Sequence, residues 1–208
     1  MNLSPYSQPP LSARPVSEPM VTLVLGGARS GKSTVAEDLV SRLPAPVTYL
    51  ATAVADPSDR DFARRIALHR QRRPLGWSTV EAGARLVEVL ADTVGTALID
   101  SLGTWVAASW ESASSGSASS GSASSGSEPD SADSLIPSER LCAILRERQG
   151  HTVLVSEEVG MGVHPSSPAG MRFRDVLGSL NQQVAAAADQ VLLVVAGRIL
   201  CLAEPPKR

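Results

Sequence analysis

The sequence predicts an α/β protein with a single domain, in which a mostly parallel β-sheet is flanked by helices. Short apolar, β-branched runs alternate with helical patterns along the chain, which is typical of βαβ units. The length of 208 residues suits one domain, and 43% hydrophobic residues can form a sizeable core. A glycine-rich loop joins the first apolar run to the first helical pattern, and it is the most informative stretch of the chain.

The glycine-rich loop spans residues 26–33 and matches the pattern G-x-x-x-x-G-K-S of the P-loop. It follows an expected strand at 21–25 and precedes a helical pattern from Thr34, which is the context that this motif requires. The loop therefore predicts the P-loop NTPase fold, of the RecA-like type, and a nucleoside triphosphate ligand. The nucleotide contacts expected in this loop are Gly26, Gly27, Ala28, Arg29, Ser30, Gly31, Lys32 and Ser33.

The residue types of the loop fit the chemistry of phosphate. Glycines let backbone N–H groups turn toward phosphate oxygens, and the N-terminus of the following helix adds a positive dipole end. We expect Lys32 to reach the β- and γ-phosphates as a catalytic group, and the Ser33 hydroxyl to ligate Mg²⁺. The alternative, a glycine-rich turn without a ligand, is disfavoured because every fixed position of the motif is filled.

Two further strand ends carry candidate site residues. The strand expected at 47–53 ends in Ala51, Thr52 and Ala53, small residues that leave room for a ligand at the carboxyl edge of an open sheet. The strand expected at 96–100 ends in Asp100, which resembles a Walker B aspartate acting on Mg²⁺; the alternative is an aspartate that caps a turn. The remaining expected elements are an extended piece at 74–81, helices at 85–91, 138–149 and 172–188, a helix carrying Trp105 and Trp110, and strands at 151–156 and 190–196.

A helix is expected at 60–73, where Phe62, Ile66 and His69 form one apolar stripe. On the pattern alone, His69 is either a packed core residue or a nucleophile, since a neutral imidazole with a pKa of about 6.5 is competent near pH 7. The arginines of this segment form either a solvated basic face or a second phosphate-facing surface. They are Arg60, Arg64, Arg65, Arg70, Arg72 and Arg73.

Composition excludes several classes of function. The net charge of −2 argues against general nucleic-acid binding, which needs a basic surface. No stretch reaches the roughly 18 to 20 apolar residues of a membrane span. The two cysteines, Cys142 and Cys201, lie far apart and outside any metal-type spacing, which fits a reduced, cytoplasmic protein.

The chain is expected to form one domain at 21–203, preceded by a disordered extension. Residues 1–20 are rich in proline and lack the apolar segment of a signal peptide. Residues 112–127 consist of three copies of Ser-Ala-Ser-Ser-Gly and a trailing serine, with no hydrophobic face at any period. We therefore expect a flexible insert at 112–134 that carries no chemistry.

Six stretches, at residues 26–33, 51–53, 65–70, 73–81, 158–162 and 173–189, form a pattern together. In this order they resemble the family of bifunctional adenosylcobinamide kinases and adenosylcobinamide-phosphate guanylyltransferases of cobalamin biosynthesis. The resemblance covers nearly all of residues 21–197 except the serine-rich insert. The P-loop is shared by many folds, whereas the block around His69 and the loop after Glu158 are much more specific.

The resemblance implies two reactions on one chain. ATP or GTP first phosphorylates adenosylcobinamide. GTP then gives GMP to adenosylcobinamide phosphate through a covalent intermediate on His69, which releases pyrophosphate and yields adenosylcobinamide-GDP. The resemblance also implies Mg²⁺ and a homo-oligomer, a trimer in this family. Besides the P-loop, it places nucleotide contacts at Ala51, Thr52, Ala53, Arg70, Gln71, Arg72, Arg73, Glu81 and Asp100.

Guanine recognition needs a separate explanation, because the sequence has no Asn-Lys-x-Asp motif. Glu81 is the candidate, since its carboxylate can accept hydrogen bonds from the guanine N1 and N2 donors. One competing interpretation is a simple P-loop kinase of a small molecule, in which His69 is merely packed. Another is a nucleotide-dependent switch or assembly module without small-molecule chemistry.

Overall fold

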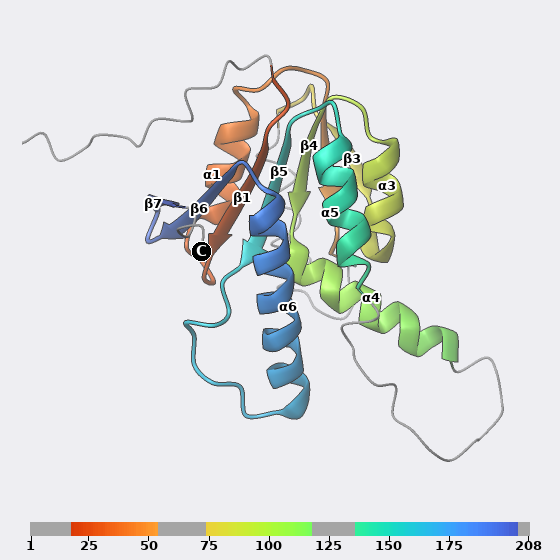
Figure 1. The fold of residues 1–208 in the computed structure, drawn as a ribbon, viewed down its shortest axis with the longest axis vertical. Coiled ribbons are helices and arrows are strands. Elements are labelled where there is room, and N and C mark those ends of the chain that lie inside the picture. The colour runs from red at the N-terminus through yellow and green to blue at the C-terminus, as the bar shows by residue number, and fades with distance from the viewer. Residues whose placement is uncertain (1–17, 54–73, 118–135, 204–208) are drawn as a thin grey trace, which may run out of the picture.

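The computed structural model describes residues 18–53, 74–117 and 136–203. Within them, seven strands form one sheet in the order β3-β2-β4-β5-β1-β6-β7 (Figure 1). Every pairing is parallel except that of β7 with β6, which is antiparallel. The mostly parallel α/β fold predicted from the sequence is confirmed. The strands are β1 Val21–Gly26, β2 Val47–Ala51, β3 Ser78–Glu81, β4 Thr96–Asp100, β5 Thr152–Glu157, β6 Gln190–Val195 and β7 Arg198–Leu202.

Helices cover both faces of the sheet, and each face has its own hydrophobic core (Figure 1). Alternate residues of β1 divide between them: Leu23 and Leu25 face the larger core under α3 to α6, and Val24 faces the smaller core under α1. Because both faces are covered, the central strands are apolar throughout. The helices are α1 Lys32–Val40, α3 Leu86–Asp92, α4 Leu102–Ser117, α5 Ser138–Glu147 and α6 Pro168–Ala187.

Two helix boundaries lie four or more residues from the predicted ones. Helix α6 begins at Pro168 rather than Arg172, because the Ser167 hydroxyl accepts a hydrogen bond from the Gly170 N–H and proline suits the first helical position. Helix α4 continues to Ser117, into the stretch for which we expected no secondary structure. A helix anchored by its buried first turns can be extended at little cost, and the Ser114 hydroxyl donates to the Trp110 carbonyl.

Several predictions fall outside the described residues. These are the extension at 1–17, the helix at 60–73, and most of the serine-rich insert. Both cysteines are described and free: Cys142 is buried, and Cys201 lies exposed on β7. Burial raises the pKa of the Cys142 thiol, an effect that nearby Arg146 partly opposes. No helix in the described ranges combines the length and apolar character needed to cross a bilayer.

Arg148 connects several segments by hydrogen bonds at the edge of the sheet opposite the P-loop. Its guanidinium donates to the carbonyls of Leu90, Thr93 and Gly95, and to the Thr152 hydroxyl. Two of these carbonyls lie around the C-terminus of α3, where orphan acceptors and the helix dipole both favour a cation. Burial lowers the pKa of Arg148 from its usual value, because desolvation disfavours the charged form. The hydrogen bonds to the carbonyls offset this cost of burying a charge.

We predict that Arg148→Met lowers the free energy of unfolding by about 2–4 kcal/mol, because it leaves several carbonyls without a donor. Arg146→Met is the matched control, since Arg146 is exposed in the last turn of α5, two residues before Arg148. It should change stability by no more than about 0.5 kcal/mol. Urea unfolding followed by circular dichroism measures both, and equal effects would show that the Arg148 contacts add nothing.

Candidate active site

The register of the parallel strands brings the candidate residues to one edge of the sheet. Ala51 at the end of β2 pairs with Glu81 of β3 on one side and with Asp100 of β4 on the other. Gly26, the first residue of the P-loop, pairs with Glu157 at the end of β5. Ligands bind at the carboxyl edge of open α/β sheets, so these strand ends define the candidate active site.

The P-loop is held in shape by backbone hydrogen bonds, both within the loop and from the β6–β7 turn. The Ser30 N–H donates to the Gly27 carbonyl over 3.2 Å, and the Ser30 carbonyl accepts from Gly197 N–H in the β6–β7 turn over 2.8 Å. Gly31 precedes α1 with a φ of 94°, a conformation that favours glycine. At Gly26, a Cβ would lie 2.4 Å from the Ser30 hydroxyl oxygen, so close packing excludes a side chain there.

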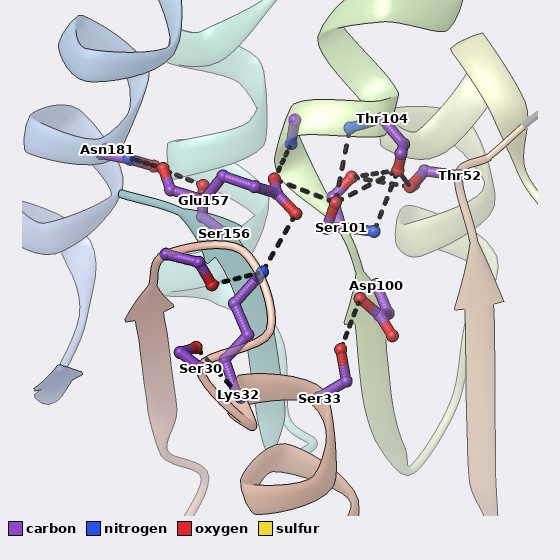
Figure 2. Close-up of polar contacts among 12 residues, drawn as sticks. Ser30, Lys32, Ser33, Thr52, Asp100, Ser101, Thr104, Ser156, Glu157 and Asn181 are labelled. Carbon is purple, nitrogen blue, oxygen red and sulfur yellow. Dashed lines mark hydrogen bonds and ion pairs between the residues drawn. The ribbon is translucent and has the colours of Figure 1, made fainter. Parts of the chain in front are cut away.

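Lys32 projects from the first turn of α1 across the mouth of the loop. Its Nζ donates to the Gly27 carbonyl over 3.4 Å and lies 3.6 Å from Oε1 of Glu157 (Figure 2). The Lys32 side chain is 12% exposed, against 30% for Glu157. The ammonium is thus enclosed beside the loop while the carboxylate stays open to solvent.

Ser33 and Asp100 meet beside this pair. The Ser33 hydroxyl donates to Oδ1 of Asp100 over 3.4 Å, and the Tyr49 hydroxyl donates to Oδ2 over 2.7 Å. The structure therefore brings together the two residues that the sequence singles out for Mg²⁺. Sequence analysis did not single out Tyr49, because its position in an apolar strand predicts a core side chain rather than a polar contact.

Glu157 is the centre of a network that sequence analysis did not find. Its Oε2 accepts from the Ser101 hydroxyl and from the Gly103 N–H, each over 3.1 Å. Ser101 and Thr104 cap α4 reciprocally through each other's backbone N–H and hydroxyl groups. The Thr52 hydroxyl contacts Thr104 Oγ1 and the Ser101 carbonyl, each over 2.6 Å, so the network reaches the end of β2 (Figure 2).

The other side of β5 is fixed by α6. The Ser156 hydroxyl donates to Oδ1 of Asn181 over 2.6 Å, and Nδ2 of Asn181 donates to the Glu157 carbonyl over 3.1 Å. Both Ser156 and Asn181 are buried. The backbone at the end of β5 is thus held by α6, while the Glu157 side chain is held by the start of α4.

The remaining predicted residues divide into two groups. Ala51, Thr52 and Ala53 lie at the end of β2, and Glu81 is exposed at the end of β3 beside them. His69, Arg70, Gln71, Arg72 and Arg73 lie outside the described residues. Sequence analysis could have singled out Glu157 as a polar residue at the end of a strand that neighbours the P-loop strand. Only the pairing of β5 with β1 reveals that Glu157 holds this position.

A family profile described as "CobU: Cobinamide kinase / cobinamide phosphate guanyltransferase" matches residues 22–202. The chain belongs to this family. It is 36% identical to the bifunctional adenosylcobalamin biosynthesis protein CobP of Pseudomonas aeruginosa, over 86% of this chain and 94% of the relative. It is 37% identical to the corresponding CobU protein of Escherichia coli, over 86% of this chain and 97% of the relative.

Solved structures show the same fold at low sequence identity. A type III secretion system ATPase superposes with a TM-score of 0.50 and 12% identity, over 85% of this chain and 52% of that one. This likeness concerns the fold alone. It agrees with the mostly parallel α/β fold that the alternating strands and helices predict.

We predict that Gly103→Ala destabilises the protein by about 1–3 kcal/mol. A Cβ at Gly103 would lie 2.1 Å from Oε2 of Glu157, so the carboxylate must leave its donors. Gly178→Ala in α6 is the matched control, because a Cβ there meets nothing within 4 Å. That helical substitution should be neutral or add up to about 1 kcal/mol. Chemical denaturation compares the two, and a Gly103 variant as stable as the control would contradict the packing argument.

Proposed function

We propose that this protein catalyses two consecutive steps of adenosylcobalamin biosynthesis. It phosphorylates adenosylcobinamide with ATP or GTP. It then transfers GMP from GTP to adenosylcobinamide phosphate through a guanylyl-histidine intermediate, giving adenosylcobinamide-GDP and pyrophosphate. The observation that carries the proposal is a formed P-loop in a chain of this family. In it, Lys32 forms an ion pair with Glu157, and the Ser33 hydroxyl donates to Asp100.

The kinase step follows from the P-loop geometry. Backbone N–H groups of residues 26–33 and the N-terminus of α1 bind the phosphate oxygens, because both present positive charge toward an anion. Lys32 moves its ammonium to the β- and γ-phosphates, where it stabilises the charge that develops on the transferring group. The acceptor is the aminopropanol hydroxyl of adenosylcobinamide.

Ser33 and Asp100 fit a magnesium ion. A hydroxyl and a carboxylate oxygen are hard donors, and Mg²⁺ in triphosphate sites takes only one or two protein ligands besides phosphate and water. When bound, the ion would neutralise charge on the phosphate oxygens.

In the transferase step, His69 acts as the nucleophile. Its imidazole nitrogen forms a bond to the α-phosphorus of GTP, and the bond from that phosphorus to the pyrophosphate oxygen breaks. A phosphate oxygen of adenosylcobinamide phosphate then attacks the same phosphorus and displaces the histidine. Arg70, Gln71, Arg72 and Arg73 supply donors for the departing pyrophosphate. In support, Ala53 follows β2 at the carboxyl edge of the sheet, and it is the last described residue before the segment that contains these side chains.

Two alternatives rank below this proposal. A simple P-loop kinase explains the Lys32 and Asp100 geometry equally well, but family membership favours the bifunctional enzyme. A nucleotide-dependent switch would bind a partner protein and would not turn over cobinamide. We also propose, on the family resemblance, that the enzyme works in the cytoplasm as a homo-oligomer, with the trimer as the expected form.

We predict that GTP labelled at the α-phosphate transfers its label to the protein, because GMP becomes bonded to His69. The phosphoramidate bond should be labile to acid and stable to base. The label should be absent in His69→Ala and present in His164→Ala, an exposed histidine that serves as the control. Denaturing gel electrophoresis after brief acid or base treatment measures it.

Two results would count against the histidine intermediate. Label that persists in His69→Ala would place the intermediate on another residue. A wild-type protein that phosphorylates adenosylcobinamide and never becomes labelled would support the simple kinase. Label from GTP labelled at the γ-phosphate would show phosphorylation rather than guanylylation.

We predict that Glu81→Gln lowers kcat/KM with GTP at least about tenfold and leaves kcat/KM with ATP within about threefold. The side-chain amide of this variant would point its NH₂ group at one of the guanine N–H donors. Two donors would then face each other, and one hydrogen bond to guanine would be lost. Initial rates of the kinase step with each nucleotide test this. Equal losses with both nucleotides would exclude a role for Glu81 in base recognition.

A further inference from the structure

The position of Glu157 points to a role in the kinase step, an inference that rests on the proposed function. We propose that Glu157 is the general base that accepts the proton of the adenosylcobinamide hydroxyl during phosphorylation, and that guanylyl transfer does not need it. Oε1 of Glu157 lies 3.6 Å from Lys32 Nζ, beside the P-loop and at the end of the strand paired with β1. This is where the terminal phosphate and its acceptor must meet.

The carboxylate is anchored through one oxygen and open at the other. Oε2 accepts hydrogen bonds from Ser101 and from Gly103 N–H in the first turn of α4, which fix the side-chain orientation. The other oxygen, Oε1, is in contact with the Lys32 ammonium. With its side chain 30% exposed, Glu157 can be reached by an acceptor that enters from solvent.

Nucleotide binding would release this open oxygen. The ammonium of Lys32 is expected to move to the β- and γ-phosphates, which carry more negative charge than one carboxylate. Oε1 then faces the γ-phosphate without its cation. In the step itself, the acceptor oxygen bonds to the γ-phosphorus, the bond to the β–γ bridging oxygen breaks, and the hydroxyl proton passes to Oε1. The products are the phosphate ester, the nucleoside diphosphate and a neutral Glu157.

Other acidic residues at this edge are engaged elsewhere. Asp100 accepts from Ser33 and Tyr49, the arrangement proposed for the metal. Oε1 of Glu158 accepts from the N–H groups of Gly160 and Met161 in its own loop. Glu81 lies on β3, which three strands separate from β1 in the sheet. Among the described carboxylates, Glu157 is therefore the one placed beside the P-loop lysine.

The two reactions differ in whether a proton must be removed. In the kinase step the acceptor is a neutral hydroxyl, which needs a base as it attacks. In the transferase step the acceptor is a phosphate monoester, whose second ionisation has a pKa of about 6, so its oxygens are already anionic near pH 7.5. Removing a base should therefore affect one reaction and leave the other.

Glu157→Gln keeps an oxygen that can accept from Ser101 and Gly103 but cannot take a proton. The kinase step is measured with adenosylcobinamide and ATP. The transferase step is measured separately with chemically prepared adenosylcobinamide phosphate and GTP. We expect kcat of the kinase step to fall at least about 100-fold, with KM for ATP and the transferase rate within about threefold of wild type. Glu88→Gln, which alters an ion-paired carboxylate on α3, is the matched control for both assays.

Two outcomes would overturn the inference. A Glu157→Gln enzyme that retains its kinase kcat has no need of this base. Equal losses in both reactions, with weaker ATP binding, would show that Glu157 only positions Lys32. Thermal unfolding checks the fold, and if the glutamine variant does not fold, Glu157→Asp decides. It withdraws the carboxylate by about 1.5 Å. A selective loss of the kinase rate supports the role, and equal losses exclude it.

The controls separate this inference from the proposed function. Wild-type protein that binds nucleotide but turns over neither corrinoid substrate would remove the proposed function, and this inference with it. If the wild-type protein catalyses both reactions and Glu157→Gln changes both rates equally, the proposed function stands. Only the role of Glu157 as general base is then excluded.

Discussion

The hydrogen bonding of β1 to a parallel neighbour on each side is the constraint on which the site depends. Gly26 pairs with Glu157 of β5 and with Val194 of β6, so the backbone enters the P-loop from a fixed position. The β6–β7 turn then supports the loop through the Gly197 N–H. Because the loop begins where three strands end, small residues and polar groups from neighbouring strands lie within reach of a bound phosphate.

Placing β5 between β1 and β4 separates two carboxylates that have different partners. Asp100 lies on the far side of β5 from the P-loop strand and contacts Ser33, whereas Glu157 lies next to the loop and contacts Lys32. If the two strands carrying the P-loop and Asp100 were adjacent, no backbone would remain to hold a second carboxylate between them. The strand order thus places one carboxylate beside Ser33 and a separate carboxylate beside the lysine.

The sequence was sufficient for features that depend on local pattern. The P-loop, the strand ending at Asp100 and the alternation of strands with helices can be recognised within a few residues, and the structure confirms these elements. Glu157 could not be recognised, because two adjacent glutamates end that strand and only its pairing with β1 identifies the one beside the loop. The early start of α6 depends on the Ser167 cap, a weaker signal than the helical pattern beginning at Arg172.

In the proposed mechanism, the two reactions share one nucleotide site and are distinguished by their acceptors rather than by their donors. Both would begin with a triphosphate at the P-loop, and both would place negative charge on a leaving diphosphate group that Lys32 and nearby donors can stabilise. They differ at the attacking atom, which is a hydroxyl in one case and an anionic phosphate oxygen in the other. A carboxylate ion-paired with Lys32 suits this division, because its charge would become available only after the lysine has engaged a nucleotide. Such coupling would prevent proton removal before a phosphate donor is present, while an acceptor that already carries negative charge would be independent of it.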